Sequence, residues 1–109
     1  MLGQLLGSVN KERVLIYLFV RGKGYPREIS RFYKSALYPL QKALENLEAA
    51  GVIVSKSVGK TREYEFNPRY AARTELQALI GRAFELYPLG LRDELRTNRS
   101  RPRRAGKPL

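Results

Sequence analysis

The sequence contains no cysteine, no histidine and no tryptophan, and it has only 10 acidic residues against 21 lysines and arginines. Without cysteine or histidine there is no thiolate nucleophile, no imidazole base and no disulfide, and the usual ligands of zinc, haem and iron–sulfur centres are missing. We therefore expect no metal and no cofactor. The sequence also lacks an uncharged apolar run of about 18 residues and a secretory leader, so we expect a cytoplasmic protein without a membrane span.

The remaining polar residues do not form an obvious catalytic constellation. The carboxylates fall on charged, exposed faces, and Glu63 and Glu65 lie two apart on one predicted strand without a partner for acid–base work. The tripeptide Gly59-Lys60-Thr61 matches the end of a P-loop, but the first glycine of that motif would fall at Val54, inside a strand. The sequence therefore argues against an enzyme.

Positive charge is the most distinctive feature that is present. The formal net charge is +11 over 109 residues, and the isoelectric point is about 10.4. Such an excess favours a polyanionic partner such as nucleic acid, although the charge could also serve solubility alone. Residues 88–109 hold seven basic and two acidic residues and few large apolar ones. We expect one domain over residues 1–87 and a disordered basic tail over 88–109, which is either a phosphate-binding arm or a solvated end.

Apolar spacing predicts three helices in the first half of the chain. The first is capped by Asn10, runs from Lys11 to Val20 and ends at the glycines that follow. It is apolar on most of its circumference, which fits either the centre of one core or a contact with a second subunit. A short helix is expected over residues 26–33. A longer one opens at Ser35 or Ala36 and ends at Gly51, and its inward stripe is Leu37, Leu40, Leu44 and Leu47.

The period then changes to two. Residues 52–58 and 61–66 flank Gly59-Lys60 and predict a β-hairpin, with Val52, Val54, Lys56 and Val58 alternating in the first strand and Arg62, Tyr64 and Phe66 in the second. Asn67-Pro68 is expected to begin a last helix that ends before Pro88. The apolar stripe of this helix consists of Leu76, Leu79, Ile80, Ala83, Phe84 and Tyr87. It is larger than closure of the domain requires, so it predicts a two-fold dimer interface, unless the stripe packs on the protein's own core.

This order of elements, mainly helical with one small hairpin in the α+β class, is that of a winged helix-turn-helix domain. The pieces Arg27–Ile29, Leu44–Ile53 and Gly59–Pro68 resemble the winged helix-turn-helix of ArsR/MarR-type transcriptional regulators. They are especially similar to the subgroup associated with minimal nucleotidyltransferases. With the opening stretch included, the resemblance covers Leu2 to Tyr87. The chain departs from the family in having Lys34 where the turn usually holds a small residue, and in lacking the ligands of the metal-sensing branch.

The resemblance implies a homodimer that binds double-stranded DNA, with the longer helix in the major groove and the hairpin as a wing on the backbone or minor groove. The solvent face of the longer helix offers Tyr38, Gln41 and Lys42 to the bases, unless it is an ordinary solvated face. Contacts to the DNA backbone are expected from Arg27, Arg31, Lys34 and Ser35. Wing contacts are expected from Lys56, Lys60 and Arg62, unless these pair with Glu63 and Glu65.

Three functions follow as hypotheses. The first is a cytoplasmic, nucleoid-associated transcriptional regulator that recognises duplex DNA. The second is a protein-interaction or antitoxin-like module that docks a separately encoded nucleotidyltransferase. The third, a binder of single strands or RNA, needs an aromatic sheet platform that the pattern does not provide.

Overall fold

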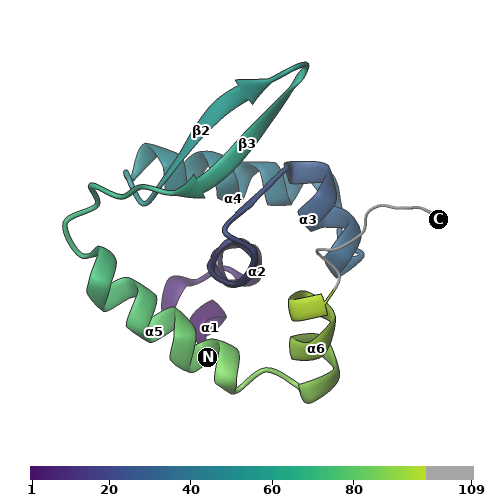
Figure 1. Cartoon of the computed structure of the whole chain (residues 1–109), viewed down its shortest axis with the longest axis vertical. Coiled ribbons are helices and arrows are strands. Elements are labelled where there is room, and N and C mark those ends of the chain that lie inside the picture. The colour runs from purple at the N-terminus through teal and green to yellow at the C-terminus, as the bar shows by residue number, and fades with distance from the viewer. Residues whose placement is uncertain (98–109) are drawn as a thin grey trace.

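A computed structural model of the protein describes residues 1–97, and within them it contains six helices and three short strands (Figure 1). The protein is mainly helical with a small antiparallel sheet, which confirms the predicted α+β class at that level. In chain order the elements are α1 (Leu2–Leu6), α2 (Val9–Arg21), β1 (Lys23–Gly24), α3 (Pro26–Tyr33), α4 (Leu37–Ala49), β2 (Ile53–Val58), β3 (Thr61–Phe66), α5 (Arg73–Glu85) and α6 (Leu89–Thr97). None of the helices described is long and apolar enough to cross a membrane.

The second helix is the centre of the core. Residues 14–18 are each at most 1% exposed, and α2 contacts all five other helices as well as β1 and β3. In Figure 1 this helix is seen end-on in the middle of the molecule. The structure therefore favours the single-core explanation of its apolar circumference. Its start differs from the prediction, because the Ser8 hydroxyl, and not Asn10, accepts the capping bond from the Lys11 N–H at 3.1 Å.

The next two helices form a pair joined by a tight turn. Proline is the first residue of α3, as predicted, and Lys34 closes that helix in the left-handed conformation with φ 53°. The turn is fixed by two bonds between the same residues, since the Ser35 N–H donates to the Ser30 carbonyl and the Ser30 hydroxyl donates to the Ser35 carbonyl. In α4, Leu40, Leu44 and Leu47 are buried, which confirms three members of the stripe, whereas Leu37 is half-buried.

The predicted hairpin is present. Strands β2 and β3 pair antiparallel from Ile53 opposite Phe66 to Val58 opposite Thr61, and β1 adds to the other side of β3, so the strand order is β1-β3-β2. Tyr64 in the second strand is buried. In the first strand burial does not follow the predicted alternation, because the neighbours Val52 and Ile53 are both buried while Lys56 and Val58 are exposed. Burial therefore decreases along the strand toward the hairpin tip.

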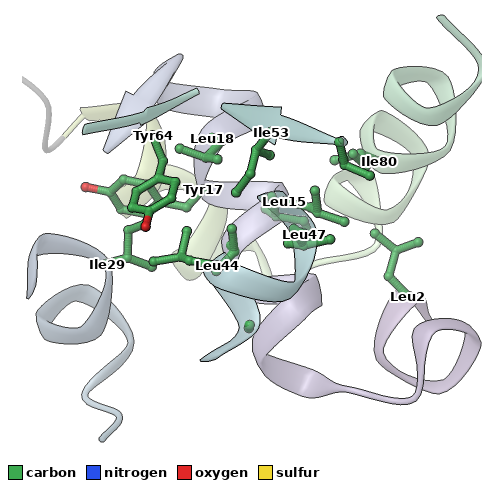
Figure 2. Close-up of a cluster of buried hydrophobic side chains, with 14 of the residues drawn as sticks. Leu2, Leu15, Tyr17, Leu18, Ile29, Leu44, Leu47, Ile53, Tyr64 and Ile80 are labelled. Carbon is green, nitrogen blue, oxygen red and sulfur yellow. The ribbon is translucent and has the colours of Figure 1, made fainter. Parts of the chain in front are cut away.

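The segment between the sheet and α5 corrects the predicted helix start. The Asn67 side chain donates to the Gly51 carbonyl at 2.9 Å and accepts from the Arg69 N–H at 3.0 Å, so it stabilises a turn. The helix begins at Arg73 instead. Its apolar stripe packs on the protein's own core, with Ile80, Ala83 and Phe84 at most 7% exposed and Leu76, Leu79 and Tyr87 packed beside them. Figure 2 shows Ile80 near Leu2 at one end of the buried cluster. The buried half of the stripe therefore follows the intramolecular alternative, whereas Leu76, Leu79 and Tyr87 stay half-buried.

A sixth helix also corrects the predicted tail. Residues 89–97 form α6, and its Leu95 is fully buried. Arg21 donates to the carbonyls of Leu95 and Glu94 at 3.1 and 3.2 Å, which ties the last turn of α6 to α2. The domain therefore extends beyond residue 87. The remainder of the predicted tail, residues 98–109, lies outside the described residues.

Candidate nucleic-acid interface

A cleft of about 580 Å³ opens between the start of α3, the outer face of α4 and the tip of the β2–β3 hairpin. We call it the hairpin cleft. Three cations, one amide and one phenol are among the side chains that line it, together with one carboxylate: Pro26, Arg27, Gln41, Glu45, Lys60, Thr61, Arg62 and Tyr64. The fold thus brings together residues from three elements. The two that are furthest apart in the chain, Pro26 and Tyr64, are 38 positions apart. The arrangement suits an extended anionic ligand with polar edges.

Arg62 is held in place by the opposite strand. Its guanidinium donates to the hydroxyls of Ser55 at 3.0 Å and Ser57 at 3.3 Å, and Ser55 in turn donates to the Glu48 carboxylate at 2.7 Å. Register explains this arrangement, because Ser57 lies directly opposite Arg62 and cross-strand partners share one face of the sheet. Pairing of Arg62 with Glu63 or Glu65, which the sequence left open, is not among the ion pairs of the described residues.

Lys56 lies on the other face of the hairpin. It is opposite Glu63 in the register, and its ammonium is 3.7 Å from the Glu63 carboxylate. The same carboxylate is 3.9 Å from the Lys23 ammonium. Because successive residues of a strand point to opposite faces, Lys56 does not line the cleft with Lys60 and Arg62. The structure therefore divides the three predicted wing residues into two that share the cleft and one that does not.

The three residues predicted to contact bases are divided as well. Gln41 lines the hairpin cleft, while Tyr38 and Lys42 line a second cleft on the side of α4 nearer the start of α2. Tyr38 is 69% exposed, and the Lys42 ammonium lies 3.7 Å from the Glu45 carboxylate, one turn further along the helix. Exposed ion pairs of this kind contribute only about 0.3–0.5 kcal/mol, so Lys42 is free to exchange this partner for a phosphate.

Among the predicted backbone contacts, Arg27, Arg31 and Lys34 are exposed on or just after α3. Ser35 is half-buried, and its hydroxyl is buried without a hydrogen-bond partner among the described residues. That hydroxyl is therefore not available to a phosphate in this conformation. The structure places Arg27 alone of these four residues in the lining of the hairpin cleft.

Sequence reasoning did not assign Thr61, Tyr64 or Glu45 to the site. The hairpin pattern already placed Thr61 beside the turn, but the approach of the hairpin to α4, through contacts of β2 with that helix, is a tertiary arrangement without a local signal. Burial, with a smaller contribution from the neighbouring Glu48 carboxylate, raises the pKa of the Tyr64 phenol. That phenol stays protonated at neutral pH and can donate a hydrogen bond.

The residues described contain no group of three or more acidic, cysteine or histidine side chains that could hold a metal ion. Comparison of the chain with known proteins gives no match to a protein-family model, to a curated protein or to a solved structure. The function is therefore argued from the site itself, since a fold alone does not establish one.

Proposed function

We propose that the protein is a double-stranded DNA-binding transcriptional regulator of the winged helix-turn-helix type. In this proposal α3 and α4 are the helix-turn-helix, α4 is the recognition helix, and the β2–β3 hairpin is the wing. The observation that supports it most directly is the hairpin cleft, in which Arg27, Lys60 and Arg62 surround the outer face of α4 beside Gln41. Cations that flank an exposed helix with a free amide are what binding in a major groove requires.

The charge along α4 fixes how the helix meets the duplex. Its acidic residues, Glu45 and Glu48, lie in the second half, and the Glu48 carboxylate already accepts a bond from Ser55. Carboxylates near phosphates are repelled, so the first half of the helix enters the groove. Gln41 can then bond an adenine edge through its amide, while Arg27 and Lys60 contact phosphates on either side of the cleft.

The homodimer expected from the sequence stays part of the proposal, but its interface changes. Side chains buried in one chain cannot form it, which removes Ile80, Ala83 and Phe84, half of the α5 stripe. Leu86 and Leu89 are 60% and 63% exposed at the junction of α5 and α6 and are available for it. The same two leucines favour the second candidate function, in which the chain docks a separately encoded nucleotidyltransferase. Changing both leucines to Asp should disrupt dimerisation or partner docking and leave the DNA-contacting residues in place, since neither leucine lines the hairpin cleft.

The test begins with selection of bound duplexes from a random pool by the full chain. Gln41→Ala should relax the preference at one position of each half-site, at a cost of about 1–3 kcal/mol for each hydrogen-bonded base that it no longer reads. Lys60→Ala should weaken binding to all sequences alike and make the salt dependence shallower by about one phosphate. Lys23→Ala is the matched control, because Lys23 is an exposed lysine that does not line the cleft.

Two results would contradict the proposal. One is duplex binding that does not change between low and moderate salt, because phosphate contacts release counterions and make affinity fall with salt. The other is tighter binding to single strands than to duplex of the same sequence, which would favour the third hypothesis. If Gln41→Ala lowers all sites equally while Lys60→Ala changes the preferred sequence, the hairpin reads the bases and α4 does not.

A further inference from the structure

A second cleft lies on the side of α4 nearer the start of α2. It measures about 480 Å³, and we call it the α2–α4 cleft. The residues around it come from the junction of α1 with α2 and from the first half of α4, and its polar lining includes Ser8, Lys11, Tyr38, Lys42 and Asn46. The hairpin cleft and the α2–α4 cleft share no lining residue, and the ion pair of Lys42 with Glu45 joins their edges across α4.

The charged side chains that line this second cleft are all positive. Two lysines line it and no carboxylate does, whereas the hairpin cleft contains Glu45. The Lys42 ammonium has the Glu45 carboxylate as a partner at 3.7 Å, and no ion pair among the described residues includes Lys11. Hydroxyl, phenol and amide groups complete the lining. Lysines together with neutral donors are typical of contacts to phosphate oxygens.

The position of the cleft relative to α4 indicates which phosphates it meets. A helix in the major groove of B-DNA lies between two sugar–phosphate strands, because the groove is only about 12 Å wide. If the hairpin cleft contacts one of these strands, the flank of α4 nearer the start of α2 is directed toward the other.

We propose that the α2–α4 cleft binds the second phosphate strand of the same duplex, with Lys11 as its main contact. This inference rests on the proposed function and deepens it. It changes the assignment of Tyr38 and Lys42, which become contacts to the backbone and leave Gln41 as the reader of bases. It also adds Lys11, whose position just inside α2 gave no signal in the sequence.

The test compares Lys11→Gln with Lys23→Gln in the full chain, using a 20-base-pair duplex of selected sequence and a second of unrelated sequence. Glutamine removes the charge of Lys11, is one atom shorter and has a similar helix propensity, and the Ser8 cap uses the backbone N–H of residue 11, so the helix start is retained. Lys11→Gln should weaken binding to both duplexes about three- to tenfold at low salt and reduce the log–log salt slope by about 0.9. Lys23→Gln should bind as the parent does, and thermal melting checks that both variants fold.

Failure of this inference can be distinguished from failure of the proposed function. If Lys11→Gln binds like the parent with the parental salt slope while Lys60→Ala is weakened, the cleft does not contact DNA and the regulator stands. If Lys11→Gln changes which sequence is preferred, Lys11 reads bases and the phosphate assignment is overturned. If Lys11→Gln and Lys60→Ala both bind like the parent, the proposed function fails with it.

Discussion

Two half-buried tyrosines share a hydrogen bond at the edge of the core. The hydroxyls of Tyr33 and Tyr87 are 3.2 Å apart, and the Arg13 guanidinium lies 5.5 Å from the centre of the Tyr33 ring. Burial raises the pKa of both phenols, and for Tyr33 the neighbouring Tyr87 raises it further. The folded protein therefore retains these protons at a pH where the unfolded chain, with an ordinary tyrosine pKa of about 10, releases them.

This difference predicts how stability depends on alkaline pH. The contribution of Tyr33 is fully present below pH of about 10 and is lost as pH rises from there toward the raised folded pKa, because the unfolded state then binds fewer protons. Tyr33→Phe should flatten the fall in the free energy of unfolding between pH 9 and about 11, measured by urea denaturation. If the free energy of unfolding falls equally with pH in the parent and the variant, the Tyr33 phenol does not retain its proton more strongly in the folded protein than in the unfolded chain.

At the scale of single elements, β1 depends on one glycine. Gly24 lies opposite Tyr64 in the sheet, and a Cβ at this position would come within 2.8 Å of the Tyr17 ring. That ring cannot move away easily, because it is fully buried, accepts a bond from Arg21 at 2.7 Å and packs edge-on against Phe32. The contact between α2 and the sheet therefore requires a residue without a side chain.

Gly24→Ala should lower the free energy of unfolding by about 1–3 kcal/mol, the usual cost of overpacking a core. Gly90→Ala in α6 is the matched control, since a Cβ there meets nothing within 4 Å. It should leave stability unchanged or raise it by up to about 1 kcal/mol, because alanine favours helix more than glycine does. Urea denaturation measures both. Equal stability of the two variants would mean that α2 and β1 can separate slightly without cost.

Local signals predicted most of these elements. Apolar spacing located α2, α3, α4 and the hairpin, and Gly51, with φ 81°, follows α4 as expected. Three features lacked such a signal. The helix α1 has only five residues and depends on contacts with α2, including the bond from the Gly3 N–H to Glu12. The helix α6 depends on Arg21, which is 74 positions from the carbonyl it meets. Asn67 resembles a helix cap but bonds Gly51 instead.

The candidate site was predictable in its residues more than in its arrangement. Exposure of Tyr38, Gln41 and Lys42 followed from the inward leucines of α4. Their division between two clefts did not, because it depends on which elements flank each side of the helix. The same applies to Lys56, whose face is set by the strand register with Glu63. Lys34, with φ 53°, shows that the turn tolerates a residue other than glycine.

At the scale of the whole molecule the net charge is +11, but one carboxylate lies among the cations of the hairpin cleft. Glu45 lines the hairpin cleft with three cations and also partners Lys42. Its carboxylate lowers the positive potential on both sides of α4. Removing this charge should therefore strengthen the attraction of the proposed interface for phosphates.

Glu45→Gln should tighten duplex binding several-fold at low salt, equally for preferred and unrelated sequences, and the gain should shrink as salt screens the charge. Fluorescence anisotropy with a labelled duplex measures the effect. Glu75→Gln is the control, because Glu75 is an exposed carboxylate on α5 and lines neither cleft. Weaker binding by Glu45→Gln than by the control would show that the carboxylate itself contacts the DNA, for example by accepting from a cytosine amino group.

The strand order gives Lys56 a different significance. Because β3 lies between β1 and β2, one side of the six-residue strand β2 has no strand neighbour among the described residues. Open strand edges invite pairing with other chains, and a lysine on such a strand opposes this, since a second strand would have to accommodate its charge. Lys56 is exposed in the middle of β2, where Glu63 holds it beside the sheet. We therefore expect Lys56 to oppose edge-to-edge aggregation of the hairpin, so that the tip with Lys60 stays accessible.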